Sequence, residues 1–149
     1  MSENYFSLLG LEVSFFIDVK AMERNYIAEH SGRHPDCFSS PADRDSAARY
    51  IAKVNEAYLA LKSPLTRAEY ILKLSGTTLQ DEDRRGLVSE VFTMFDSQDP
   101  ESGIKSEISK CWERVERSFA ESDMYQAALQ VEKLKYLKKL DKSGDACNF

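Results

Sequence analysis

The most regular pattern in the first half of the chain is a stripe of apolar residues at helical spacing. Its members are Ala47, Ile51, Val54, Tyr58 and Leu61. Intervals of three and four residues place them on one face of an α-helix and leave polar residues on the others. Ser63-Pro64 follows, and proline disfavours helix in the residue before it. Because no stretch shows the sustained alternation of apolar and polar residues that predicts a strand, we expect an all-α chain.

A second amphipathic helix is predicted ahead of this one, from Asp18 to about His30. Asp18 is a favourable N-cap, and apolar residues recur at i, i+3 and i+7 from Val19. Lys20 and Arg24 lie one turn apart on a neighbouring face that we expect to be exposed.

Two shorter helices are predicted to pack on this helical hairpin. One is apolar and covers residues 4–10, and the other covers residues 66–74 and ends at Ser75-Gly76. Residues 1–76 are therefore expected to form the first of two all-helical domains.

The loop between the two long helices is Ser31-Gly32-Arg33-His34-Pro35-Asp36-Cys37. Gly32 is expected to break the preceding helix, and Pro35 biases His34 toward an extended backbone. Asp36 can hydrogen-bond the nearby backbone, as Asx residues do in turns. We therefore expect a stiff, solvent-facing loop that displays one imidazole and one carboxylate.

Residues 77–149 are predicted to form the second domain, an antiparallel three-helix bundle. Its helices are expected at residues 87–95, 104–119 and 124–140, with a break over Asp99–Gly103 and an exit at Ser122-Asp123. The middle helix has one apolar stripe, whereas the outer two have apolar residues on two sides. The second stripe of the last helix comprises Tyr125, Leu129, Tyr136 and Leu140. Because a bundle core needs one stripe per helix, the surplus either packs on the first domain or binds a partner.

Composition and motifs argue against several functional classes. The net charge is −5, and no cluster of Lys and Arg suits a nucleic acid. Cys37, Cys111 and Cys147 are too scattered for a disulfide framework or a zinc site, and unpaired thiols suggest a reducing compartment. We find no signal peptide and no apolar run long enough to span a membrane. The expected location is therefore the cytoplasm.

Catalysis and metal binding by this chain are also disfavoured. His30 and His34 could share a helical face with Asp36 nearby, but the breaks in the loop spoil that geometry for a metal. A dyad of Cys37 with His34 would need a third group and a pocket. Since the chain has no glycine-rich phosphate loop either, we predict no catalytic residue, no metal and no cofactor.

The order and spacing of the first-domain motifs resemble a J-domain. The motifs are the start Tyr5-Phe6-Ser7-Leu8-Leu9-Gly10-Leu11, a helix bearing Tyr26, the tripeptide His34-Pro35-Asp36, and Asn55-Glu56-Ala57-Tyr58. Two further segments are similar to the HscB family, the J-type co-chaperones of iron–sulfur cluster assembly. They are Pro64-Leu65-Thr66-Arg67-Ala68-Glu69-Tyr70-Ile71-Leu72 and Val131-Glu132-Lys133-Leu134-Lys135-Tyr136-Leu137-Lys138-Lys139-Leu140.

The resemblance implies an adaptor with two binding ends. One end would dock on the ATPase of a DnaK-like chaperone of the HscA type and stimulate it, so that the chemistry belongs to the partner; its residues are His34, Pro35, Asp36, Lys20, Arg24 and Arg33. The other end would hold an IscU-type scaffold protein. Leu87, Val88, Val91 and Tyr136 match the family's apolar scaffold-binding patch, and the surplus apolar stripes add Phe95 and Leu140 to this predicted site. Two alternatives remain open: a general J-protein that recruits a housekeeping DnaK chaperone to other clients, and a structural adaptor with an inactive loop.

This chain departs from the family pattern at several positions. Arg33 and Cys37 flank the tripeptide where the family usually has an aromatic residue and a lysine, and the second helix has fewer basic residues than usual. Phe92 and Phe95 stand where acidic residues usually accompany the scaffold-binding patch.

Overall fold

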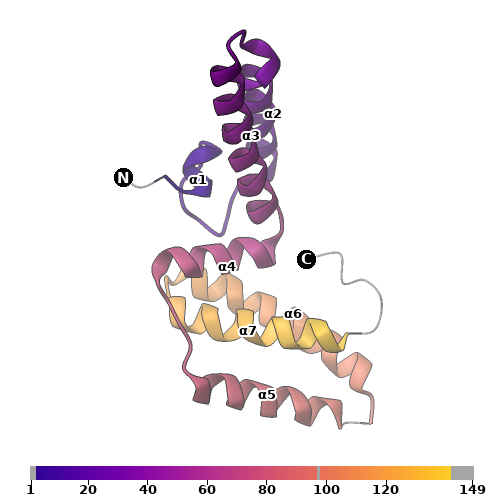
Figure 1. Cartoon of the computed structure of the whole chain (residues 1–149). Coiled ribbons are helices and arrows are strands. Elements are labelled where there is room, and N and C mark those ends of the chain that lie inside the picture. Colours follow the sequence, from indigo (N-terminus) through magenta and orange to yellow (C-terminus); the bar gives the residue numbers. More distant parts are fainter. Residues whose placement is uncertain (1–2, 97, 142–149) are drawn as a thin grey trace. The chain divides into compact units, whose positions relative to one another are not determined.

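The computed structural model describes residues 3–96 and 98–141, and within those ranges the chain is helical and has no strand (Figure 1). This confirms the all-α prediction. The polar tail over residues 143–145 and Cys147 lie outside the described residues. By its internal contacts the chain divides into two compact units, Met1–Arg67 and Ala68–Phe149. This division falls within one helix, and the domain boundary after residue 76 stays a prediction.

The first unit is built on an antiparallel helical hairpin (Figure 1). It contains α1 (Tyr5–Leu8), α2 (Val19–Arg33), the 3₁₀ turn η1 (Pro35–Cys37), α3 (Pro41–Lys62) and the start of α4 (Pro64–Ser75). Asp18 caps α2 as expected, because its side chain accepts a hydrogen bond from the amide of Ala21. Four of the five residues in the predicted stripe of α3 are buried, Val54 and Leu61 fully, and Tyr58 is half-buried.

The second unit contains the rest of α4 and three further helices: α5 (Asp81–Phe95), α6 (Pro100–Ala120) and α7 (Met124–Leu140). The single stripe of α6 is buried, and α5 packs on both α6 and α7. The turn between α6 and α7 passes through Ser122, which has a φ of 58°, the left-handed region that few non-glycine residues adopt. Within the bundle, α5 and α7 lie side by side (Figure 1).

Several helix ends differ from the sequence-based expectation. The prediction that Gly32 breaks α2 is wrong: the helix runs through Gly32 to Arg33 and stops where Pro35 holds His34 extended, at φ −63° and ψ 140°. Pro41 is the first residue of α3, with Ser40 as N-cap. Likewise α6 begins at Pro100, so the expected break over Asp99–Gly103 is shorter than predicted.

Candidate functional site

The predicted loop of the first unit is a solvent-exposed turn centred on Pro35. The His34 side chain is 51% exposed and that of Asp36 is 90% exposed. The amide of Cys37 donates to the carbonyl of His34 at 2.9 Å, and the amide of Phe38 donates to that of Pro35 at 3.1 Å. These two hydrogen bonds close the turn at the main chain, so the two side chains can face solvent.

The contact that stiffens the turn comes from the histidine rather than from the expected Asx hydrogen bond. The His34 ring accepts a hydrogen bond at Nδ1 from the amide of Asp36, at 3.2 Å. The Asp36 carboxylate lies 3.3 Å from the same nitrogen. The amide contact requires a lone pair on Nδ1, whereas an ion pair with the carboxylate requires a proton on the same nitrogen. The imidazole is thereby oriented by the residue two positions ahead of it.

Polar and aromatic contacts join α2 to α3 below the turn. Tyr26 donates from its hydroxyl to Asn55 Oδ1 at 2.7 Å, and His30 Nε2 lies 2.7 Å from the same oxygen. The Tyr26 ring stacks on Tyr58 with 4.2 Å between ring centroids. The only buried apolar side chain of α2 is Met22. We call this set of contacts the polar seam of the hairpin.

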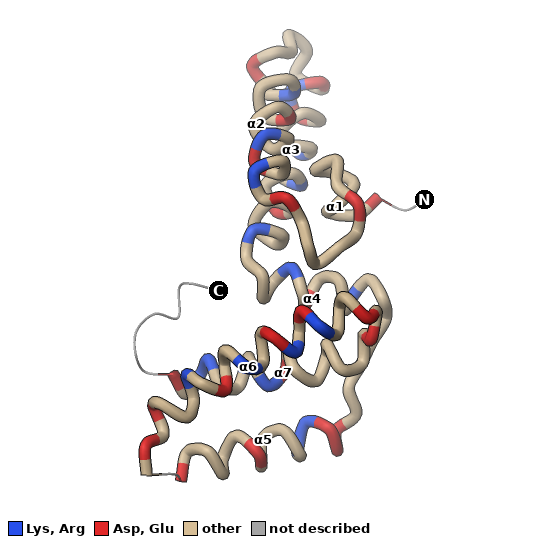
Figure 2. Tube along the Cα trace, turned by 180° about the vertical axis from the view of Figure 1, so that it is seen from behind, with Lys and Arg blue, Asp and Glu red and all other residues tan. Residues whose placement is uncertain are grey.

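The three predicted basic residues of α2 do not form one patch. Arg33 lies over the ring of Tyr50 at 4.5 Å, and its Nε is 3.4 Å from Glu29. At about 100° per residue, the nine residues from Arg24 to Arg33 turn the helix by half a circle. Lys20 and Arg24 are exposed on the other side, and basic and acidic residues are interspersed along the hairpin (Figure 2). On their side the structure also exposes Ile27, which the sequence analysis did not single out.

The second unit has an apolar groove between α5 and α7. Its lining residues are Val88, Val91, Phe92, Tyr136, Lys139 and Leu140. The groove has a volume of about 160 Å³ and an almost wholly apolar wall. Phe92 is the most exposed of its apolar residues, at 66%.

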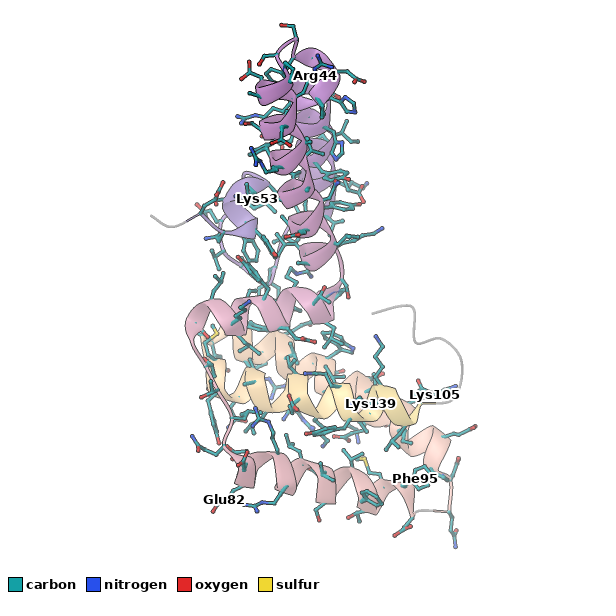
Figure 3. The ribbon with its side chains drawn as sticks, in the orientation of Figure 1. Arg44, Lys53, Glu82, Phe95, Lys105 and Lys139 are labelled. Atoms are coloured by element: carbon teal, nitrogen blue, oxygen red, sulfur yellow. The ribbon has the colours of Figure 1, made fainter. Side chains whose placement is uncertain are left out.

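The predicted scaffold-binding residues separate into groups. Four of them line the groove: Val88, Val91, Tyr136 and Leu140. Leu87 is buried, and Phe95 is exposed near the end of α5 without lining the groove (Figure 3). Phe92 and Lys139 line the groove but were not among the predicted site residues, although Phe92 follows Val88 at helical spacing.

Tyr136 lies one turn after Glu132 on α7. Burial, together with a hydrogen bond to the Glu132 carboxylate one turn earlier, raises the pKa of the Tyr136 hydroxyl. The phenol therefore stays neutral at neutral pH. What it offers to a ligand is the apolar ring.

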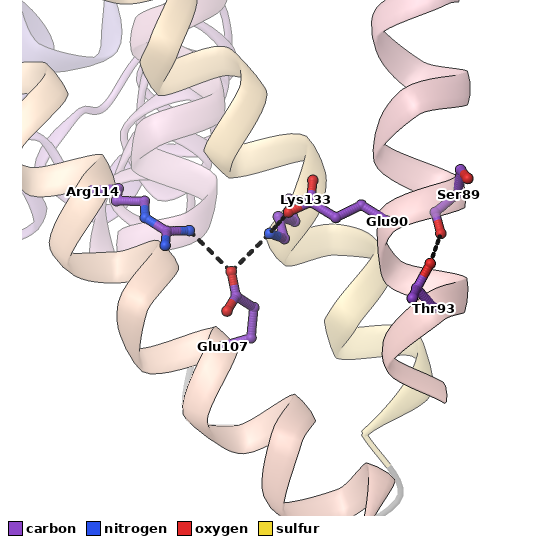
Figure 4. Close-up of polar contacts among 6 residues, drawn as sticks. All are labelled: Ser89, Glu90, Thr93, Glu107, Arg114 and Lys133. Atoms are coloured by element: carbon purple, nitrogen blue, oxygen red, sulfur yellow. Dashed lines mark hydrogen bonds and ion pairs between the residues drawn. The ribbon is translucent and has the colours of Figure 1, made fainter. Parts of the chain in front are cut away.

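A chain of charged side chains crosses the bundle from α5 through α7 to α6 (Figure 4). Lys133 of α7 is only 2% exposed and donates from Nζ to Glu90 of α5 at 2.6 Å and to Glu107 of α6 at 2.7 Å. Arg114 donates to the same oxygen of Glu107 at 2.9 Å. We call these four residues the ionic layer.

The protonation of the ionic layer follows from its contacts. Burial acts against charge on both Lys133 and Glu107, but their mutual hydrogen bond and the further bonds to Glu90 and Arg114 outweigh it. The pKa of Lys133 is therefore raised and that of Glu107 is lowered. Both groups are charged at neutral pH.

Three other features of the described residues bear on function: metal ligands, membrane-spanning helices and cysteines. Residues 3–96 and 98–141 hold no group of three or more His, Cys, Asp or Glu side chains placed to bind a metal ion. No helix in those ranges is both long and apolar enough to cross a bilayer. Cys37 is exposed, whereas Cys111 is buried and burial raises its pKa to about 11.

An all-helical chain whose hairpin carries an exposed His-Pro-Asp turn, joined to a helical C-terminal unit, has the features of a J-domain co-chaperone. Comparison with known proteins makes this class specific. A co-chaperone HscB homologue of Vibrio campbellii is 34% identical over 157 aligned residues, which cover 92% of each chain. An HscB homologue of Vibrio cholerae is 32% identical over the same share of both chains. The chain belongs to the HscB family of co-chaperones.

Solved structures agree with this assignment. The crystal structure of the human co-chaperone HscB matches with a TM-score of 0.78 at 26% identity, covering 95% of this chain and 80% of the human one. The structure of HscB from Vibrio cholerae matches with a TM-score of 0.73 at 29% identity over 97% of both chains. No family model matches the chain. The resemblance to HscB is thus confirmed, and the roles of single site residues stay predictions.

Proposed function

We propose that the chain stimulates the ATPase of a DnaK-like chaperone of the HscA type and delivers an IscU-type scaffold protein to it during iron–sulfur cluster assembly. Membership of the HscB family supports this proposal. The observation that carries it is the exposed turn at His34-Pro35-Asp36, held by hydrogen bonds within the turn itself. In this proposal the chain is a regulator, and the ATPase partner performs the reaction.

The chaperone-binding end would consist of the turn and the exposed cations of α2. Asp36 would present its charge to the ATPase, since it is almost fully exposed. Lys20 and Arg24 would meet an acidic surface, and charge pairs of this kind chiefly raise the association rate. Arg33 would support the end of α2 against Tyr50 rather than contact the partner directly.

The scaffold-binding end would be the groove between α5 and α7, which Phe92 lines and which Phe95 would extend. Leu87 would support this end from the core. Aromatic and aliphatic side chains in a preformed groove are the usual anchors of a protein interface. Because two phenylalanines replace acidic residues of the family pattern, the contact with the scaffold should be more apolar than in relatives.

Scaffold binding and ATPase stimulation would be linked in the ternary complex. Such a link requires a coupling free energy, typically about 1–3 kcal/mol. We place this activity in the bacterial cytoplasm, since the two Vibrio relatives found by sequence comparison are bacterial. Neither a nucleic acid nor a membrane is part of the proposal.

The proposal is tested by steady-state ATPase measurements on an HscA-type chaperone, with and without an IscU-type scaffold. Asp36→Asn and His34→Gln should each abolish the stimulation and leave scaffold binding intact. Asp43→Asn, which neutralises an exposed carboxylate seven residues further on, is the matched control and should stimulate like the wild type. Stimulation that survives Asp36→Asn would refute the role of the turn. Capture of unfolded clients in place of the scaffold would favour a general J-protein.

A further inference from the structure

The ionic layer joins α5, α6 and α7 through one buried ammonium group (Figure 4). Lys133 reaches Glu90 on α5 and Glu107 on α6 at the same time. Glu107 is also nearly buried, whereas the Glu90 side chain is 55% exposed and arrives from the surface. Glu90 is therefore the exposed end of the ionic layer, and it is the residue that α5 contributes to that layer.

The layer and the groove lie on opposite flanks of α5. Leu87 and Val91 are buried and mark the face that packs on the bundle. At about 100° per residue, Glu90 lies to one side of Val91 and Phe92 to the other, with Val88 on the side of Phe92. A rotation of α5 about its axis would therefore change the layer and the groove together.

Apolar packing alone does not determine that rotation closely, because the hydrophobic effect is non-directional. A buried ammonium group is costly unless it is paired and hydrogen-bonded. If α5 turned or slid by one residue, Lys133 would lose the Glu90 carboxylate. Directional polar contacts of this kind can specify a helix register, as buried polar residues do in coiled coils.

We propose that Lys133 is a positioning residue for the apolar groove. Its ammonium group, held by Glu107, receives Glu90 and thereby sets the rotation of α5 over α7, so that Val88 and Phe92 of α5 face the groove that Tyr136 and Leu140 line. Lys133 is too buried to touch a protein partner itself. Its importance for scaffold capture rests on the proposed function, but its effect on the groove does not.

The test compares two variants that break the layer from opposite ends. Lys133→Met removes the ammonium group, keeps an unbranched side chain, and leaves Glu107 paired with Arg114. Glu90→Gln removes the charge at the exposed end and spares the core. Glu82→Gln makes the same charge change at the exposed start of α5 (Figure 3) and is the matched control.

The first readout needs no partner. In methyl-labelled protein, the Val88 and Leu140 signals should shift in Lys133→Met and in Glu90→Gln, and stay in place in Glu82→Gln. A residue that only stabilises the fold would lower the unfolding midpoint and leave these native-state signals unchanged. Unmoved signals in a folded Lys133→Met or Glu90→Gln protein would overturn the proposal.

The second readout is the affinity for an IscU-type scaffold, measured by calorimetry well below the unfolding midpoint. Both variants should bind roughly three- to tenfold more weakly, and the loss should shrink when Tyr136→Ala has already damaged the groove. Weaker binding by Glu90→Gln alone would mark Glu90 as a direct contact and overturn the role of Lys133. If the wild type does not bind the scaffold, the proposed function fails, and the methyl signals still decide the positioning role.

Discussion

Val91 and Phe92 are neighbours on α5 with opposite surroundings, and replacing each by alanine should separate stability from binding. Val91 is 3% exposed and Phe92 is 66% exposed. Val91→Ala removes two buried carbon atoms at about 0.8 kcal/mol each, and the remaining cavity brings the loss of unfolding free energy to about 2 kcal/mol. Phe92→Ala removes a largely solvated ring, so its cost should stay below about 0.5 kcal/mol.

Urea unfolding at neutral pH measures both values. Trp112, the single tryptophan of the chain, lies in α6, so its fluorescence reports on the second unit. Binding should show the complementary pattern for Phe92→Ala, which we expect to weaken scaffold affinity by about 1–2 kcal/mol as an interface anchor. Equal destabilisation by the two variants, or a Phe92→Ala protein that binds like the wild type, would refute this division between the buried and the exposed residue of the groove.

Two further predictions concern ionisation in the second unit. The pKa of Glu107 in the folded protein lies below its ordinary value of 4.5, so the folded state binds fewer protons than the unfolded state there. Stability should therefore fall as the pH drops below about 4.5, and Glu107→Gln, compared in urea titrations at several pH values, should flatten that part of the profile. In a Cys147→Ser background at pH 8, iodoacetamide should modify exposed Cys37 within minutes and spare buried Cys111, whose pKa is about 11. Mass spectrometry checks this, and rapid modification of Cys111 in the native protein would contradict its burial.

The order and type of the helices could be predicted from apolar spacing, but their ends could not. The stripe of α3 marked a helix whose core residues are buried as expected. The starts of α5 and α6 lie several residues ahead of the first apolar position, because Gln80 and Asp99 cap them there. Capping depends on local hydrogen bonds that a search for apolar periodicity does not include.

The sequence predicted which residues share a face of one helix, but not which residues of different helices come into contact. The surplus stripes correctly placed apolar residues on α5 and α7, and the groove lies between these helices. The side on which Arg33 lies depends on Tyr50 and Glu29, and one of these belongs to another helix. The ionic layer was not predicted, because its contacts also join different helices. In addition, a lysine in a helical pattern is usually exposed.

The polar seam of the hairpin has a consequence for how the first unit opens. Near the turn, α2 is held to α3 by hydrogen bonds and stacked rings, while its buried apolar side chain, Met22, lies near its other end. Segments that bury little apolar surface open at low free-energy cost. Amide hydrogen exchange should therefore be graded along α2, fastest beside His34 and slowest beside Met22. A partner that binds the turn would slow amide exchange at the end of α2 without contacting that end. Part of the partner's binding free energy would then be offset by the cost of ordering the helix.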